Sequence, residues 1–514
     1  MSYWDVWESK KLLDYGVFER QGALINVHFM TGVLPSPERF NYVNHPYPIH
    51  WVNTLWYYIC GPAGIVLFNA LLGLATVLIV FAALKQFFDP RTALVGALLY
   101  TLAPSTILFD VDMNQSAMGA MLWPLSFLIF GLQKNNQRPP NVFWLAFAIF
   151  IFGQVTWSIY TIIPCLLLMT TNIGYTKDSG LQWEIDSKTT LAILIGTFVT
   201  GCLFALQILY YTYSWGDLFK YVMVQTNGEA RIPLLNIVRV IALRMILSVG
   251  FAVSLGAIVG AVLLSYRKRI NSSELGTLIY PVIFLASSLI LPRYFYTEIH
   301  MYEYLIFPLT VISCVAIQNL NNKKFEVLLL CLGVIGACYP LLQSTIPKQS
   351  NVAKALSKIV ESSSKPGEVV ATNLELRKFP FANWDIAGID TVAKISDRLF
   401  KENISSQPEF TKLLAGFKTD LLNVVFIYSA SNPISPEFLS ELQNLESPQA
   451  EPLTLPAENP QLALYLRNFY WKLTGKFSVN TTYNHPIVDK IDLQIFHLTL
   501  TRSNNGNVII SAVK

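Results

Sequence analysis

The sequence has few charged residues and lacks the motifs of soluble enzymes. Only 14% of its 514 residues are charged, while 53% are hydrophobic. The six cysteines lie in or beside apolar segments, and none follows Cys338, so the C-terminal region is built without disulfides. That region contains neither a G-x-G-x-x-G motif nor a nucleophile elbow. Residues 2–60 contain no long apolar run, so we expect no secretory signal there. The net charge of +4 is too small to indicate a nucleic-acid surface.

Long apolar runs are abundant before residue 345. The run AGIVLFNALLGLATVLIVFAAL is free of charge over the roughly 20 residues that a bilayer helix needs. The stretch around Gly153 and Gln154 predicts a broken or tilted pair of helices. The sequence therefore predicts a mainly α-helical, polytopic membrane protein, with a bundle of about ten helices over residues 61–345. The apolar segments lie near residues 62–84, 92–109, 116–132, 142–154, 156–172, 189–212, 240–265, 276–292, 302–319 and 325–343.

Positive charges fall in alternate loops, which predicts the orientation. With the broken pair counted as two crossings, all the basic clusters lie on one side, which the positive-inside rule makes cytoplasmic. The opening loop (residues 1–60) and the C-terminal region then lie outside a plasma (inner) membrane. The basic clusters are Lys85/Arg91, Lys134/Arg138, Lys177/Lys188, Arg267/Lys268/Arg269 and Lys323/Lys324.

From residue 346 onward the composition is that of a globular domain. KPGEVVATN, LLNVVFIYSA and KIDLQIFHLTL are typical of strands, whereas VAKALSKIVESSS and SPEFLSELQNL are typical of helices. Residues 346–514 are therefore expected to form a small extracytoplasmic α/β domain.

The opening loop contains the first candidate catalytic residues. Asp5 and Glu8 are three residues apart and share one face of a helix, beside Trp4 and Trp7, which suit a membrane interface. A carboxylate just above the bilayer is suited to take a proton from an acceptor group. The alternative is a solvated interfacial helix without a catalytic role.

A short external turn contains two further carboxylates. Asp110 and Asp112, followed by Gln115, end one apolar segment and begin the next. They are suited to bind an acceptor or a divalent cation, or simply to cap the two helices. The spacing of the histidines in the opening loop fits no zinc pattern, so no metal site or cofactor is expected.

A third external segment, PRYFYTEIHMYEY, contains Arg293 and His300. A cation here, or Arg231 in the preceding external loop, would neutralise the phosphate of a lipid leaving group. The alternative is an interfacial tyrosine belt whose arginine meets lipid headgroups.

Four motifs occur in a fixed order along the chain: KLLDYGVF, NHPYPIHWVNTLWYYICGPAG, LAPSTILFDVDMNQSAMGAML and HMYEYLIFPL. In this order they resemble motifs of the GT-C glycosyltransferases, in particular the protein O-mannosyltransferase and aminoarabinose-transferase-like group. The resemblance covers roughly residues 1–345 and implies a GT-C-like fold. It also implies inverting transfer of a sugar from a polyprenyl-phosphate donor to an external glycan, glycolipid or protein acceptor, assisted by an acidic residue of the first external loop.

The resemblance assigns roles to the candidate residues. It implies that Asp5, Glu8 and Asp112 are catalytic. In this family an acidic motif follows a first transmembrane helix, and Met1 falls where that motif should end. We therefore expect that helix and the principal acid to lie upstream of Met1. The residues expected to bind substrate are Asp110, Gln115, His45, Tyr47, Arg293, His300 and Arg231.

Two other functions remain as alternatives. A transporter or flippase of lipid-linked saccharides would favour charged or polar residues at mid-bilayer and symmetry between halves. Only Gln154 and Arg244 suggest such residues. A non-catalytic scaffold would display the C-terminal domain on a membrane anchor, for which ten spans are more than enough.

Overall fold

The computed structural model places most of the helical region and the strands of the C-terminal domain. Outside these ranges it places Ser9, Leu13 and Gly216 alone. The described ranges are 48–109, 114–136, 142–176, 180–212, 234–266, 272–290, 299–345, 358–365, 368–373, 399–401, 404–416, 420–429, 434–445, 449–454, 490–503 and 508–513.

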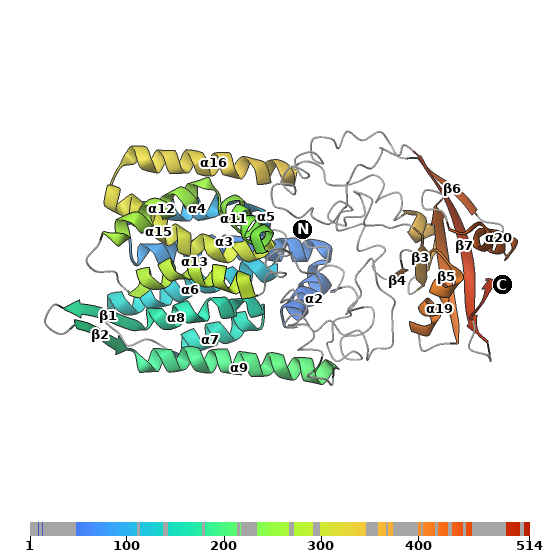
Figure 1. Cartoon of the computed structure of the whole chain (residues 1–514), viewed down its shortest axis with the longest axis horizontal. Helices are drawn as coiled ribbons and strands as arrows, with labels where there is room; N and C mark the ends of the chain where they lie inside the picture. Colours follow the sequence, from blue (N-terminus) through green and yellow to red (C-terminus); the bar gives the residue numbers. More distant parts are fainter. Residues whose placement is uncertain are drawn as a thin grey trace.

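The helical region is a bundle, with α16 along one flank and α9 along the other (Figure 1). The fold class predicted from the sequence, mainly α with a small C-terminal α/β domain, is confirmed. The helices of the bundle are α2 (Pro48–Cys60), α3 (Pro62–Lys85), α4 (Pro90–Thr101), α5 (Pro104–Phe109), α6 (Asn114–Asn136), α7 (Val142–Gly153), η1 (Trp157–Thr161), α8 (Ile163–Met169), α9 (Ser187–Thr212), α11 (Leu234–Val249), α12 (Phe251–Ser265), α13 (Ser272–Ile290), η2 (Ile299–Leu305), α15 (Ile306–Leu320) and α16 (Lys323–Thr345).

Among the described residues, three helices are long and apolar enough to cross a membrane, or four if one bent pair counts as a span. Two of them, Leu67–Lys85 and Ser187–Tyr210, have only 28% of the tested segment buried. An apolar helix whose surface stays exposed is suited to face lipid. The third, Met301–Leu320, is 89% buried and runs through the core of the bundle. Together with four shorter apolar helices, these describe a multi-pass membrane protein.

Several helices are interrupted inside the bundle. The predicted broken pair is confirmed, because α7 ends at Gly153 and the 3₁₀ helix η1 precedes α8. Two segments that the sequence suggests as continuous are also broken. Residues 92–109 divide into α4 and α5, where Pro104 lacks the N–H that a continuous helix needs. Residues 240–265 bend by 103° between α11 and α12 at Gly250, whose φ of +87° favours glycine.

A β-hairpin that the sequence did not predict connects α8 to α9. Strands β1 (Thr171–Thr176) and β2 (Gly180–Ile185) pair antiparallel, with Thr171 opposite Ile185. The hairpin projects from the end of the bundle opposite the C-terminal domain (Figure 1). The sequence signal is a turn, DSG, between two short runs rich in β-forming residues.

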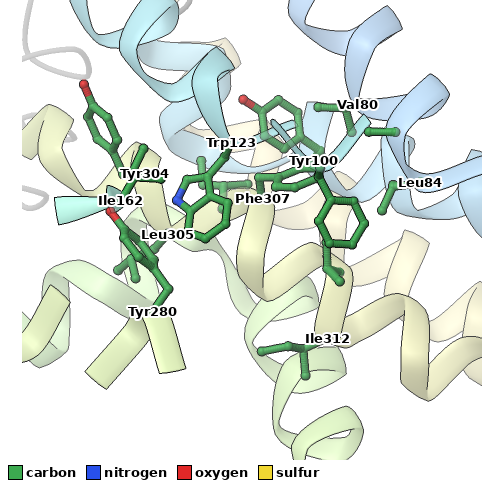
Figure 2. Packing of buried hydrophobic residues seen from close by; sticks show 14 of the residues in the cluster. Val80, Leu84, Tyr100, Trp123, Ile162, Tyr280, Tyr304, Leu305, Phe307 and Ile312 are labelled. Atoms are coloured by element: carbon green, nitrogen blue, oxygen red, sulfur yellow. The ribbon is translucent and has the colours of Figure 1, made fainter. Parts of the chain in front are cut away.

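The core of the bundle is aromatic and closely packed. Figure 2 shows Trp123 of α6 between Tyr280, Leu305 and Phe307. The Trp123 and Tyr280 rings meet edge to face, with centroids 5.0 Å apart at 82°. Such a pair contributes roughly 0.5–1.5 kcal/mol beyond the burial of its area.

The α4 and α16 helices are joined near the hairpin end of the bundle. Asp89 caps α4 by accepting hydrogen bonds from the Arg91 and Thr92 amides, at 3.0 and 3.1 Å, and from the Thr92 hydroxyl at 2.6 Å. The Arg91 guanidinium donates to the Glu326 carboxylate at 2.5 Å. This ion pair fixes the start of α16 against the start of α4.

The C-terminal domain is a six-stranded mixed sheet in the order β4-β3-β5-β7-β6, with β8 also on β7. Strands β3, β4 and β5 are parallel, and the others pair antiparallel. Two helices pack on one face, where Phe410 and Phe438 meet Phe426 and Phe496. The elements are β3 (Val369–Thr372), β4 (Leu399–Lys401), α19 (Gln407–Gly416), β5 (Leu421–Ser429), α20 (Pro436–Leu445), β6 (Gln449–Thr454), β7 (Lys490–Arg502) and β8 (Val508–Ala512).

Candidate functional site

Four elements meet at one end of the bundle, which we call the site end. Helix α5 and the 3₁₀ helix η2 contact each other there, and both contact α6 and α11. Figure 1 shows α5 and α11 at the end of the bundle that lies nearest α2 and the C-terminal domain. Asp110 and Asp112 connect α5 to α6, Arg231 precedes α11, and Arg293 precedes η2. The fold therefore brings together the elements that adjoin three separately predicted segments.

The predicted site residues themselves are mostly outside the described residues. Gln115 lies in the first turn of α6, and His300 lies in the first turn of η2. For these two the structure describes the backbone, and their roles stay predictions. The predicted residues outside the described ranges are Asp5, Glu8, His45, Tyr47, Asp110, Asp112, Arg231 and Arg293.

The η2 helix is the most deeply enclosed element at the site end. Each residue from Met301 to Leu305 is at most 2% exposed. The Tyr302 ring packs against Phe284 of α13, with centroids 5.4 Å apart. Because all its described side chains are packed, η2 cannot shift without repacking its neighbours. It continues directly into α15, the buried helix of the bundle.

Two opposite charges are buried in elements that contact each other at the site end. Arg244 of α11 is 0% exposed and Glu303 of η2 is 1% exposed. Both residues take part in interactions. A buried charge is tolerated only where its surroundings compensate it, so these residues mark a polar interior at this end. Sequence reasoning noticed Arg244 only near a span end and missed Glu303. The signal was an acid within the apolar run MYEYL.

The tightest contact at the site end joins α6 to η2. A Cβ on Gly119 would lie 2.0 Å from the Tyr304 hydroxyl oxygen and 2.6 Å from Cγ2 of Thr156. The phenol end of Tyr304 therefore rests directly on the α6 backbone. Thr156 comes from the break between α7 and η1, so this break supplies one wall of the contact. Sequence reasoning identified the break but neither Gly119 nor Tyr304.

A second polar contact lies deeper in the core, beneath Gly119. Trp123, one turn further along α6, packs on Tyr280 of α13. The Tyr280 and Thr161 hydroxyls are 3.0 Å apart. A hydrogen bond inside such a packed aromatic core fixes ring orientation as well as adding stability.

Helix α2 borders the site end and has an unusual distribution of side chains. Its apolar residues Trp51, Leu55 and Ile59 are exposed, while His50 and Asn53 are buried. A helix with an outward apolar face is suited to lie in a membrane interface, with tryptophan near the headgroups. Helix α2 is therefore amphipathic, and its polar face points into the protein.

The described residues contain no group of three His, Cys, Asp or Glu side chains arranged to hold a metal ion. The chemistry that the described part of the site end offers consists of hydroxyl, amide and buried charged groups.

A family model described as dolichyl-phosphate-mannose-protein mannosyltransferase matches residues 44–175. The matched region runs from α2 through α8 into β1 and contains two of the four motifs on which the resemblance was predicted. A search of curated proteins found no match.

Several solved structures are similar to the chain. The apo oligosaccharyltransferase of Archaeoglobus fulgidus has 15% identity and a TM-score of 0.49, over 82% of this chain and 65% of that one. The chain thus spans about two thirds of that enzyme's length. The same enzyme tethered with an acceptor peptide has 11% identity and a TM-score of 0.48, over 100% and 70%. Apo ArnT from Cupriavidus metallidurans has 12% identity and a TM-score of 0.35, over 87% and 90%.

These structural matches are too distant to assign an activity. The sequence match is more informative, because it includes α5 and α6, two of the four elements of the site end. It confirms, over residues 44–175, the predicted resemblance to the protein O-mannosyltransferase group.

Proposed function

We propose that the protein is a membrane glycosyltransferase that moves a sugar from a polyprenyl-phosphate donor to an acceptor on the external face of the membrane. The observation that carries this proposal is the family-model match over residues 44–175. That region supplies α2, α5 and α6, which lie at or beside the site end. The acceptor is a glycan, a glycolipid or a protein.

The reaction is a direct displacement at the anomeric carbon. A carboxylate, Asp5, Glu8 or Asp112, takes the proton of the acceptor hydroxyl or amine as that group attacks. The bond between the anomeric carbon and the phosphate oxygen breaks, and its electron pair leaves with the polyprenyl phosphate. The configuration of the sugar is inverted.

Basic residues around the site end would stabilise the leaving group. Arg231 and Arg293 would neutralise the charge that develops on the departing phosphate. The remaining predicted residues would bind the sugar and its neighbouring groups, namely Asp110, Gln115, His45, Tyr47 and His300.

The surroundings of the site end suit a lipid-linked donor. Helix α3 exposes Leu67, Leu71, Leu74 and Leu78 along one side, a stripe that fits acyl chains. It follows α2 after Gly61, so a lipid-facing helix leads directly to an interfacial one. A polyprenyl chain can therefore stay in the bilayer while its phosphate reaches the site.

The test uses the full chain in lipid nanodiscs with a polyprenyl phosphate carrying a radiolabelled hexose or pentose. We expect the label to leave the donor for an acceptor in added membranes, with release of polyprenyl phosphate. Asp5→Asn, Glu8→Gln and Asp112→Asn should each be compared with Asp420→Asn, an exposed control in the C-terminal domain. Undiminished transfer in all three would remove these residues as catalysts. Absence of transfer and of donor binding in the wild type would refute the proposal.

The proposed orientation has its own test. The hairpin and the C-terminal domain lie at opposite ends of the bundle (Figure 1), so they should face opposite sides of the membrane. In a background without exposed native cysteines, Val513→Cys should react with an impermeant maleimide on intact cells. Ser179→Cys, between β1 and β2 in the sequence, should react only after permeabilisation. The reverse pattern would place the site on the cytoplasmic side.

A further inference from the structure

The contact between Gly119 and Tyr304 links two elements that contain predicted substrate-binding residues. Gln115 precedes Gly119 by four residues on α6, which places the two on one face of that helix. His300 precedes Tyr304 by four residues within η2. The separation between α6 and η2 therefore sets the separation between the backbones at Gln115 and His300.

Only glycine permits the observed approach of these elements. The Tyr304 hydroxyl oxygen lies 2.0 Å, and its Cζ 3.0 Å, from the place that a Cβ at position 119 would occupy. Carbon and oxygen in ordinary contact are at least 3.4 Å apart. A methyl group at position 119 would thus push the phenol end of Tyr304 away by about 1 Å or more. Because the described side chains of η2 are all buried, that displacement passes to the η2 backbone.

We propose that the contact of Gly119 with Tyr304 and Thr156 is a positioning contact, which sets the distance between His300 and Gln115 for the sugar-bearing end of the donor. This inference rests on the proposed function. Gly119 and Tyr304 need not touch the substrate, because they act through the two elements that they hold together. A misplacement of about 1 Å in such a site can lower a reaction rate by about 100-fold.

The distances suggest a compensating pair of substitutions. Gly119→Ala should lower sugar transfer by on the order of 100-fold. Adding Tyr304→Phe removes the hydroxyl oxygen, the nearest of the clashing atoms, and leaves Cγ2 of Thr156 at 2.6 Å and the ring carbon at 3.0 Å. The double variant should therefore recover part of the lost transfer. Relief of the clash would also rescue a folding defect, so the KM for the donor is the readout that identifies a positioning role.

A matched control exists in the core of the bundle. A Cβ on Gly260 of α12 would lie 2.0 Å from the backbone carbonyl oxygen of Ile312 in α15, the same distance as in the Gly119 contact. Gly260→Ala should lower thermal stability without changing the donor KM of the protein that remains folded. Tyr280→Phe is the control for Tyr304→Phe, since it removes a tyrosine hydroxyl from the deeper contact with Thr161.

The experiment compares two probes on the full chain in nanodiscs: polyprenyl phosphate alone and the same lipid phosphate carrying a sugar. We expect Gly119→Ala to weaken binding and transfer of the sugar-bearing donor while the bare lipid phosphate still binds. Equal weakening for both probes, or no recovery in the Gly119→Ala/Tyr304→Phe double variant, would overturn the inference. A wild type that binds neither probe would refute the proposed function instead.

If Gly119→Ala does not accumulate, Tyr304→Phe alone decides the question. It should raise the KM for the sugar-bearing donor several-fold with little change in melting temperature. Tyr280→Phe should instead lower the melting temperature and leave the KM for the sugar-bearing donor nearly unchanged. An unchanged KM in Tyr304→Phe would overturn the inference.

Discussion

The bend between α11 and α12 predicts how three glycine substitutions should differ. Gly250 has φ +87° and ψ 156°, a backbone region that is nearly exclusive to glycine. A Cβ there would also lie 2.9 Å from Cδ of Pro104, at the start of α5. Gly61 has a similar backbone, φ +66° and ψ −162°, but its Cβ would meet nothing within 4 Å. Gly336, within α16, has neither the unusual backbone nor a close neighbour.

The expected losses follow from these differences. Gly61→Ala carries the backbone strain alone, about 1–3 kcal/mol. Gly250→Ala carries the same strain and must also displace the rigid ring of Pro104, so its loss should exceed that of Gly61→Ala. Gly336→Ala should cost nothing and can gain up to about 1 kcal/mol, because alanine favours the helix.

Thermal unfolding of the purified protein in detergent, followed by tryptophan fluorescence, measures the three variants side by side. The melting temperature should be highest for Gly336→Ala, lower for Gly61→Ala and lowest for Gly250→Ala. Gly250→Ala should also reduce donor binding, because α11 contacts η2 and α5 at the site end. Equal melting temperatures for Gly250→Ala and Gly336→Ala would refute the role assigned to the bend.

Three further substitutions test contacts away from the site. Hydrogen bonds from the Thr92 side chain and amide hold the pKa of the Asp89 carboxyl below its ordinary value of 3.8. Asp89→Ala should therefore be less stable than the wild type by about 1 kcal/mol above pH 3.8, and this difference should disappear as the pH falls further. Asn373→Ala removes two buried hydrogen bonds to the Ser429 backbone, of 2.7 and 2.8 Å, and should lower the stability of the C-terminal domain by about 1–3 kcal/mol for each group. Glu326→Gln should cost roughly 1 kcal/mol or less, and less still in high salt, because the Arg91 side chain is 48% exposed.

The sequence predicted the features that depend on local composition or on the pattern of apolar residues within one segment. The strands β3, β5 and β7 were predicted from runs of β-branched residues, and each is present. The break after α7 was predicted because two short apolar runs flank Gly153 and Gln154. These signals are local, so one sequence is enough to find them.

The bends and the hairpin were missed for a physical reason. A membrane helix is apolar on all sides, so hydropathy cannot distinguish a straight segment from one that turns by 103° at Gly250. Glycine is common in such helices, and only the φ of +87° in the folded protein marks this one as a corner. The same limit applies to the site, where Glu303 acquires meaning only through the burial of η2 and its contact with α11.

The α6 helix shows how a polar site can adjoin an apolar core. Gln115, Gly119, Trp123 and Phe127 follow one another at intervals of four residues, so they lie along one face from the site end inward. Gly119 receives a tyrosine hydroxyl, and Trp123 packs on a tyrosine whose hydroxyl bonds to a threonine. Phe127 packs on the rings of Phe87 and Phe307. Polarity thus declines from the site end inward along this face of α6, and Gly119 lies where the polar part begins. A substitution at Gly119 should therefore affect the site, whereas one near Phe127 should affect stability alone.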